Sequence, residues 1–288
     1  MRMAKVAGIT LGAWALLVRR FGMSTAFGSQ LKHWRSLRRM SQLDLSLHAG
    51  VSARHLSFLE TGRSRPRQNV ILRLAEALDV PLRDRNDLLR SVGLPIHYPE
   101  ARLSDESLAP YRNIIDQMLS HHAPYPGFVL DRWWNMTEAN APARQLFLGG
   151  RDLAVDGPVN MLDWMQEPAV RQLIVNWDEA LWAGVQRLRR EVDESGGDAR
   201  LSEFLARALA VAGDVTRPAP EYSDNPVLCI RLRVPLGDGT FQELSVLSTI
   251  ARFGTTREIT LDELRIELVF PADETTAEFF RQAASQST

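Results

Sequence analysis

Residues 41–67 read SQLDLSLHAGVSARHLSFLETGRSRPR. Ser41 and Ser52 each precede a helical apolar pattern, where an N-cap side chain accepts hydrogen bonds from the first turn. Gly50 permits the positive φ of a sharp turn, and Gly62 is placed to end the second helix. The expected apolar positions are Leu43, Leu45, Leu47 and Ala49 on the first helix and Val51, Leu56 and Leu59 on the second. The stretch predicts two short amphipathic helices joined by a tight turn.

Three arginines follow the second helix, at positions 63, 65 and 67. A helix, a glycine and a helix also occur in ordinary helical hairpins. The combination of two caps, a turn glycine, an apolar register and a basic exit favours a helix-turn-helix instead. In such a motif the second helix enters the major groove of DNA.

The charge of the chain is distributed unevenly. Residues 23–98 hold twelve Lys/Arg and six Asp/Glu, and residues 1–22 hold four Lys/Arg and no Asp/Glu. Since the whole chain of 288 residues has a net charge of −1, residues 99–288 carry −11. A basic segment favours a polyanionic partner, and an acidic segment disfavours one. The length and this asymmetry predict two domains.

A single cysteine, Cys229, excludes an internal disulfide and a cysteine-based zinc site. This usage is consistent with a reducing compartment, and we expect a cytoplasmic protein.

The first residues contain a mostly apolar run, Val6 to Val18, that is too short to span a bilayer as a helix. Three interpretations are open: a signal peptide, an appended helix, or a translation start at Met23. No small-residue cleavage site precedes Arg19-Arg20, and export would place a DNA-binding segment outside the cell. We favour the start at Met23, assign 1–27 to an N-terminal extension, and expect no membrane partner.

Hydrophobic periodicity and turn signals divide the rest of the chain. The basic segment, 28–92, is predicted to be all-α, with further helices over 29–39, 69–78 and 82–92. Gly93, Pro95 and Pro99 mark a linker over 93–103. Residues 104–288 are predicted to form an α+β domain. Its expected strands are 127–130, 133–137, 228–234, 241–250 and 265–270, and its expected helices are 104–122, 140–148, 161–165, 169–191, 201–211 and one from 274.

Several strings resemble a known family. RHLSFLETGRSRPR from Arg54 and LRLAEALDVPLRDRN from Leu72 resemble Xre-type helix-turn-helix regulators of the MmyB-like group. YPGFVLDRWWN from Tyr125, EANA from Glu138 and STIARFGT from Ser248 are similar to the ligand-binding domain of that group. The resemblance covers all but residues 1–22. It implies a PAS-like fold, an antiparallel sheet flanked by helices, and a pocket for a small apolar ligand such as a fatty acid.

The resemblance also implies a DNA-contacting face. In the phage-repressor pattern Ser52, Ala53, Arg54 and Phe58 face the groove, and Gln42 lies near a phosphate. A guanidinium can bind guanine bidentately, so Arg54 is the expected base reader. Phe58 either packs on a thymine methyl or covers the seam between two helices.

Neighbouring side chains are expected to contact the DNA backbone rather than the bases. His55 and Ser57 are within reach of phosphate or sugar. Glu60 is interpreted as structural, paired with a nearby arginine. The three loop arginines, Arg63, Arg65 and Arg67, either bind phosphates or form a solvated loop.

Tryptophans are abundant in the second domain. They line a ligand pocket or simply pack the core, and two asparagines are available as polar groups. The predicted pocket residues are Trp133, Trp134, Asn135, Asn140 and Trp164.

Catalytic signals are missing from the sequence. It contains no phosphate-binding, dinucleotide-binding or nucleophile-elbow motif. His121-His122 lacks a carboxylate at ligand spacing. We therefore expect no enzyme, no cofactor and no metal.

The leading hypothesis is a homodimeric regulator that binds a double-stranded DNA operator and responds to a small apolar ligand. The resemblance to the family implies a repressor rather than an activator. Two alternatives remain: a DNA-binding protein whose second domain binds a protein partner, and an enzyme with a DNA-binding head.

Overall fold

The computed structural model describes residues 25–213, 215 and 227–286. The predicted extension, apart from residues 25–27, and the alternative start at Met23 therefore lie outside the described residues. The chain divides into two compact units. Residues up to Pro99, with Asp193–Gly196, belong to the first unit, and Glu100–Val192 with the residues from Gly197 onward form the second. The division after Pro99 falls inside the predicted linker.

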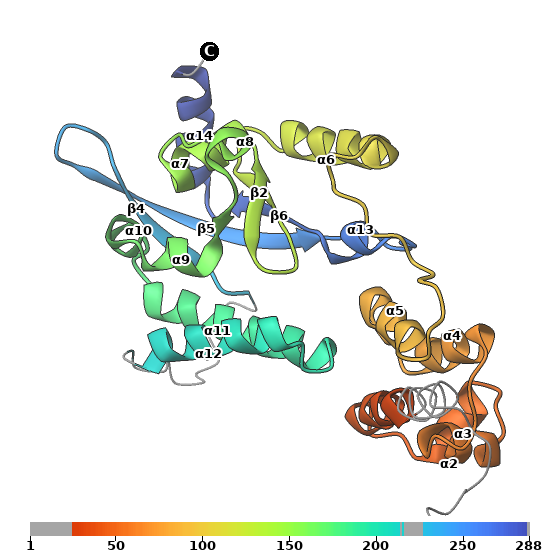
Figure 1. The fold of residues 1–288 in the computed structure, drawn as a ribbon. Coiled ribbons are helices and arrows are strands. Elements are labelled where there is room, and N and C mark those ends of the chain that lie inside the picture. Colours follow the sequence, from red (N-terminus) through yellow and green to blue (C-terminus); the bar gives the residue numbers. More distant parts are fainter. Residues whose placement is uncertain (1–24, 214, 216–226, 287–288) are drawn as a thin grey trace, which may run out of the picture. The chain divides into compact units, whose positions relative to one another are not determined.

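The first unit is helical in its described part (Figure 1). Its helices are one over 25–37, α2 (Gln42–His48), α3 (Ala53–Glu60), α4 (Gln68–Ala77) and α5 (Leu82–Ser91). The first is already helical at residue 25, four residues before its predicted start. The others lie within one or two residues of their predicted positions, and the predicted all-α character of this unit is confirmed.

The helix-turn-helix forms through the caps expected of it. The hydroxyl of Ser41 accepts a hydrogen bond from the Asp44 N–H (3.1 Å), and the Asp44 carboxylate accepts one from the Ser41 N–H (3.0 Å). Ser52 accepts in the same way from the His55 N–H (3.2 Å). Gly50 has φ +60° in the turn, a conformation that costs a residue with a Cβ more than glycine.

Of the four apolar positions predicted to be buried on α2, the first helix of the helix-turn-helix, only two are buried. Leu45 is fully buried and Ala49 nearly so, but Leu43 and Leu47 are 60% and 72% exposed. Residues two apart lie about 200° apart around an α-helix, so Leu43 and Leu47 point away from the face that Leu45 buries.

Helix 25–37 and α3 pack at very short range because Gly28 has no side chain. A Cβ built there would lie 2.4 Å from the carbonyl oxygen of Glu60. This close approach places the end of α3 directly against the first helix.

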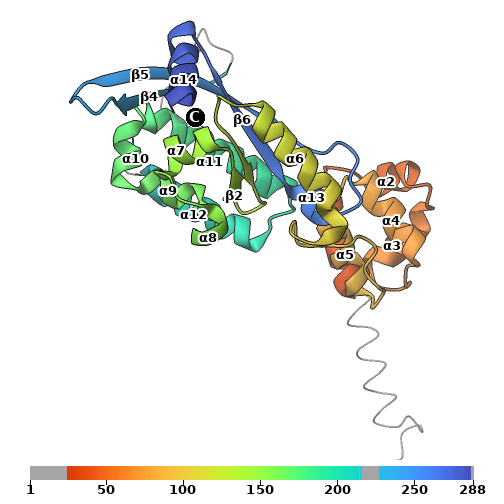
Figure 2. The same cartoon turned by 90° about the horizontal axis from the view of Figure 1, so that it is seen from above.

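The second unit contains a six-stranded antiparallel sheet in the order β3-β2-β1-β6-β5-β4 (Figures 1 and 2). The strands are β1 (Gly127–Leu130), β2 (Asn135–Ala139), β3 (Val159–Asn160), β4 (Ile230–Pro235), β5 (Phe241–Ala251) and β6 (Arg265–Pro271). The predicted α+β class, an antiparallel sheet flanked by helices, is confirmed.

Helices accompany the sheet on both faces. They are η1 (Glu106–Leu108), α6 (Ala109–His121), α7 (Ala141–Leu148), α8 (Leu153–Asp156), α9 (Met161–Gln166), α10 (Pro168–Leu173), α11 (Trp177–Glu194), α12 (Ala199–Gly213), α13 (Ile259–Glu263) and α14 (Glu274–Gln286). Strand β1 shows the two faces by alternation. Phe128 and Leu130 join the core that includes residues of α11 and α12, whereas Val129 packs with residues of α6 and α13.

Two predicted elements differ from the structure. The predicted strand 133–137 begins only at Asn135, because Asp131 to Trp134 form a turn in which Trp134 has φ +61°. The Asp131 carboxylate accepts hydrogen bonds from the N–H groups of Trp133 (2.7 Å) and Asn135 (2.9 Å).

The predicted helix 169–191 is two helices, α10 and α11. Residues 174–176 interrupt it because they pair with β4. The Val175 N–H donates to the Arg231 carbonyl (2.8 Å), and the Asn176 side chain accepts from the Arg231 N–H (2.9 Å).

Within the described residues, none of the helices has the length and apolar character needed to cross a membrane.

Candidate nucleic-acid interface and ligand cavity

Helix α3 presents a polar, outward-facing surface. Ser52, Ala53 and Arg54 are exposed, and His55, Ser57 and Phe58 are half-buried. The Arg54 guanidinium lies over the Phe58 ring, 5.5 Å from its centroid. Such a cation–π contact restrains a long side chain that otherwise has many rotamers. The Arg54 and Phe58 side chains are thus held against each other on this surface.

Glu60, at the end of α3, is structural, as the sequence predicted. Its carboxylate accepts hydrogen bonds from Arg35 (2.6 and 3.1 Å) and from Gln42 Nε2 (2.7 Å). Burial raises the pKa of Glu60, but these two donors and the positive charge of Arg35 outweigh it, and the net shift is downward. The Gln42 amide therefore has one N–H committed to Glu60 rather than to solvent.

The three arginines after α3 are all exposed, but their environments differ. Arg65 Nη2 donates to the carbonyl of Val92 at the end of α5. Arg63 and Arg67 make no such side-chain bond to another described residue.

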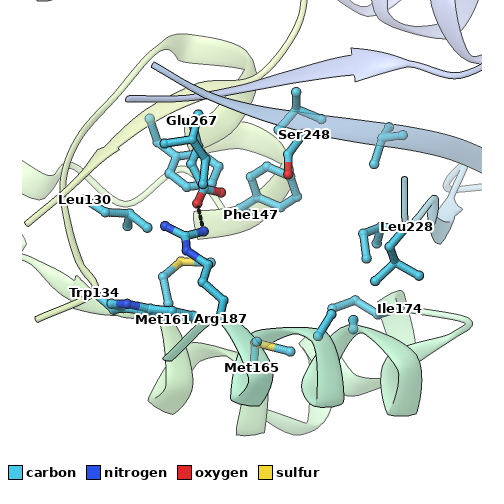
Figure 3. Close-up of a pocket in the computed structure, with 18 of the residues that line it drawn as sticks. Leu130, Trp134, Phe147, Met161, Met165, Ile174, Arg187, Leu228, Ser248 and Glu267 are labelled. Atoms are coloured by element: carbon cyan, nitrogen blue, oxygen red, sulfur yellow. Dashed lines mark hydrogen bonds and ion pairs between the residues drawn. The ribbon is translucent and has the colours of Figure 1, made fainter. Parts of the chain in front are cut away.

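The second unit contains a cavity of about 340 Å³ between the sheet and α11 (Figure 3). Much of its wall is apolar and buried. Phe128, Leu130, Trp164, Ile174, Leu232, Val246 and Val269 contribute buried side chains to the wall, and Phe147, Met161 and Met165 contribute half-buried ones. Pockets of this size and lining hold small organic ligands.

A charged cluster borders the cavity. In Figure 3 the Arg187 side chain rises from α11 to form an ion pair with Glu267 on β6. Glu191 accepts from Arg187 Nε (3.2 Å) and from Trp134 Nε1 (2.7 Å), and it pairs with Arg265 (3.2 Å). We call these four charged residues, Arg187, Glu191, Arg265 and Glu267, the buried quartet.

The two arginines of the quartet have pKa values that shift in opposite directions. Burial lowers the pKa of Arg187, but the carboxylates of Glu267 and Glu191 outweigh it and the net shift is upward. Burial lowers the pKa of Arg265, against the attraction of Glu191. The Arg187 guanidinium also lies 4.7 Å from the centroid of the Trp134 ring.

The predicted pocket residues are distributed over different environments. Trp134 and Trp164 line the cavity. The guanidinium groups of Arg132 and Arg200 lie 5.2 and 4.2 Å from the centroid of the Trp133 ring, and Trp133 borders a separate pocket of about 150 Å³.

Neither predicted asparagine lines the cavity, because backbone and loop groups occupy both side chains. Asn135 donates to the Asp131 carboxylate (2.8 Å). Asn140 caps α7 and donates to the carbonyls of Leu119 (3.0 Å) and Tyr125 (2.9 Å).

The polar groups at the cavity are instead Arg187, Arg190, Ser248 and Glu267, which the sequence prediction missed. Two signals were available. Arg187 and Glu191 stand four apart on an amphipathic helix, and Glu267 stands between the apolar residues Ile266 and Leu268 on β6.

Metal-ligating groups do not gather in the described part of the chain: no set of three or more His, Cys, Asp or Glu is placed to hold an ion. One ring nitrogen of His122, Nε2, instead lies 2.9 Å from the carbonyl oxygen of Val269.

Comparison with known proteins gives structural likenesses and two family matches. A solved chain described as "Structure of an RNA-binding Light-Oxygen-Voltage Receptor" is 16% identical, with a TM-score of 0.25, covering 99% of this chain and 70% of that chain. That score supports no conclusion. No curated protein matches the sequence.

The family matches cover both units. Residues 26–88 match a helix-turn-helix domain, and residues 111–283, more than half of the chain, match the MmyB-like transcription regulator ligand binding domain. These are domains of transcription regulators rather than of enzymes. The chain therefore belongs to the MmyB-like family of transcription regulators, with an N-terminal helix-turn-helix domain and a ligand-binding domain.

Proposed function

We propose that this regulator binds a palindromic DNA operator as a homodimer, represses transcription, and responds to a small apolar ligand such as a fatty acid in the cavity beside α11. The observation that carries the ligand part is the apolar cavity of about 340 Å³ inside the matched ligand-binding segment. The outward, cationic surface of α3 and its following loop supports the DNA part.

Regulation requires that the ligand bind the DNA-competent and DNA-incompetent arrangements with different affinity, since equal affinity shifts no population. A mobility-shift assay with the DNA upstream of the protein's own gene, with and without dodecanoate, tests the proposal. We expect a specific complex whose affinity changes when dodecanoate is added. Binding that is independent of sequence and disappears at moderate salt would contradict operator recognition.

Subunit number is tested on the same complex. We expect two protein chains per operator duplex in sedimentation velocity, because two-fold symmetric proteins read two half-sites. One chain per duplex at saturation would contradict the homodimer.

Arg54→Ala is expected to weaken operator binding by about 1–3 kcal/mol, because it removes a side chain able to pair bidentately with guanine. Phe58→Leu keeps apolar volume but removes the ring under the guanidinium, and we expect a smaller loss of affinity. Fluorescence anisotropy with operator and scrambled duplexes measures both. Arg90→Ala, in an exposed pair on α5, is the control. Equal weakening on both duplexes would assign Arg54 to phosphate instead of a base.

Arg63→Ala is expected to weaken operator and scrambled duplexes alike and to reduce the slope of log K against log salt by about 1, since one phosphate contact is lost. Arg65→Ala is expected to change the slope less, because the Arg65 side chain is bonded to the Val92 carbonyl. Anisotropy titrations over a range of salt concentrations measure both slopes. An unchanged slope for Arg63→Ala would show that this arginine is merely solvated.

A further inference from the structure

Residues 97 and 98 lie in the predicted linker, yet one side chain of α5 holds their backbone. The Asn86 carbonyl oxygen accepts hydrogen bonds from the N–H groups of His97 (3.0 Å) and Tyr98 (3.1 Å), and its amide nitrogen donates to the Tyr98 carbonyl (2.7 Å). Asn86 is 1% exposed, so its polar atoms depend on these partners. The Arg85 guanidinium also donates to the Tyr98 hydroxyl (3.2 Å). The helix-turn-helix unit therefore holds the chain up to residue 98.

A second anchor holds the chain on the other side of the unit boundary. The Ala101 N–H donates to Glu258 Oε1 (2.8 Å), and the Ala101 carbonyl accepts from the Thr260 hydroxyl (2.5 Å). Glu258 is the N-cap of α13, and its other carboxylate oxygen accepts from the Leu261 N–H (2.8 Å). Ala101 also packs against the apolar core to which α6 and α13 contribute. The ligand-binding unit therefore holds the chain from residue 101.

Only two residues, Pro99 and Glu100, separate these anchors, and the boundary between the units falls between them. We call these two residues the joint. They allow Tyr98 and Ala101 a Cα separation of at most about 11 Å. The proline ring fixes one of the two φ angles and restricts the residue before it. The whole predicted linker, 93–103, could absorb a rearrangement of either unit, whereas the joint has little conformational freedom.

Each anchor is attached to a part of its unit that the proposed function uses. In the ligand-binding unit, α13 leads into β6, which contributes Glu267 to the wall of the cavity. In the helix-turn-helix unit, Asn86 stands on α5, and Leu89 of α5 shares a core with Leu56 of α3. A bonded path thus leads from the cavity wall to the joint, and another from the joint to α3.

We propose that Asn86 and the pair Glu258 and Thr260 are positioning residues that keep the joint stiff, so that ligand binding in the cavity changes the placement of α3 and with it the affinity for the operator. This inference rests on the proposed ligand response. It adds the residues that transmit the response and confines the flexible part of the predicted linker to the joint.

The stiffness of the joint is tested without a ligand, by electron–electron distance measurement on full-length protein. Nitroxides are attached through Asn69→Cys and Gln117→Cys, two exposed positions in different units, in a Cys229→Ser background diluted with unlabelled protein. In Asn86→Ala the next backbone anchor among the described residues is the bond from the Leu94 N–H to the Leu89 carbonyl. The chain between anchors then grows from two residues to about six, and the distance distribution should broaden roughly 1.7-fold.

Two further variants complete the distance measurement. Thr260→Val keeps the shape of the side chain but removes the donor to the Ala101 carbonyl, and we expect a smaller broadening. Asp87→Ala is the matched control, because Asp87 is exposed beside Asn86 on α5 and pairs with Arg90 rather than with the linker. Its distribution should equal that of the unaltered protein. If Asn86→Ala fails to protect α5 in hydrogen exchange, Thr260→Val, in the other unit, decides the test.

Transmission is measured as the ratio of operator dissociation constants with and without dodecanoate. We expect a ratio of about 5- to 150-fold in the unaltered protein, the usual range for linked sites, and a ratio at least about threefold smaller in Asn86→Ala and Thr260→Val. The affinity for dodecanoate without DNA should stay the same in both variants, because neither residue lines the cavity. A purely structural defect would not lower the coupling while leaving ligand affinity intact.

The outcomes separate this inference from the proposed function. If dodecanoate leaves operator binding of the unaltered protein unchanged, the proposed ligand response fails, and the distance measurement alone decides whether the anchors stiffen the joint. If both variants are as narrow as the Asp87→Ala control, the chain connections on either side of Asp193–Gly196 hold the units instead, and the inference is overturned. Broad distributions with undiminished coupling would overturn the transmitting role of the anchors.

Discussion

Glu191→Ala is expected to lower the free energy of unfolding of the ligand-binding unit by about 3–5 kcal/mol, the cost of breaking a buried ion pair by removing one partner. Glu191 is 8% exposed and is the common acceptor for Arg187, Arg265 and the Trp134 indole. Without it, Arg265, only 6% exposed, keeps its charge but loses its carboxylate partner. Urea unfolding combined with hydrogen exchange measures the change, because exchange reports each unit separately.

Asp163→Ala is the matched control in the same unit. Asp163 pairs with Arg207 on α12, and both side chains are more than half exposed. Exposed pairs contribute about 0–1 kcal/mol, so this variant should unfold nearly as the unaltered protein does. If Glu191→Ala lowers the free energy of unfolding no more than Asp163→Ala does, a stabilising role for the quartet is contradicted.

Glu60→Ala is expected to lower the free energy of unfolding of the helix-turn-helix unit by a similar amount, about 3–5 kcal/mol. The side chains of Glu60 and Arg35 are 4% and 14% exposed, so the substitution leaves a guanidinium that is largely out of water without its carboxylate. Gln42 also loses its acceptor. Hydrogen exchange of helix 25–37, α2 and α3 should show the loss of protection.

The Glu60 pair also predicts a pH dependence. The folded-state pKa of Glu60 lies below its ordinary value. A depressed carboxyl pKa stabilises the fold at pH values above the unfolded pKa of about 4.3, and that contribution disappears as the pH falls through the lower folded pKa. Glu60→Ala should therefore remove part of the acid sensitivity of this unit.

Asp87→Ala serves as the control for Glu60→Ala. Asp87 pairs with Arg90 on α5 with both side chains about half exposed. We expect a change of at most about 1 kcal/mol and no change in acid sensitivity attributable to a buried pair. If the two variants behave alike, the Arg35–Glu60 pair is not a stabilising contact.

The helix-turn-helix could be predicted in detail because its signals are local. Each cap joins residues three apart, as in Ser41 with Asp44 and Ser52 with His55. The exception was the pair Leu43 and Leu47, where an alternating apolar pattern was counted as one helical face. Periodicity has to be scored against 3.6 residues per turn, and by that measure only Leu45 and Ala49 share the buried side.

The sheet was predictable where strands alternate and less so where distant residues intervene. Strand β5 was predicted over 241–250 and observed as Phe241–Ala251. The break between α10 and α11 was missed because it depends on β4, some 55 residues later, which pairs with residues 174–176. A helical pattern in the sequence continues through that break, so only the pairing reveals it.

The polar groups of the cavity also could not be predicted from the sequence, because they are brought together from distant parts of the chain. Asn135 and Asn140 were predicted as ligand groups from their neighbourhood, yet their side chains satisfy loop and backbone groups. Arg187 and Glu267, which meet at the cavity, are 80 positions apart.

By itself the sequence determined the helix-turn-helix and the α+β class of the second unit, because caps, turns and periodicity act within a few residues. The family followed from the resemblance of whole sequence strings, not from those local patterns. The tertiary structure alone decided which charges meet at the cavity. Ion pairs between distant segments depend on how α11 and β6 are brought together, and no local pattern encodes that meeting.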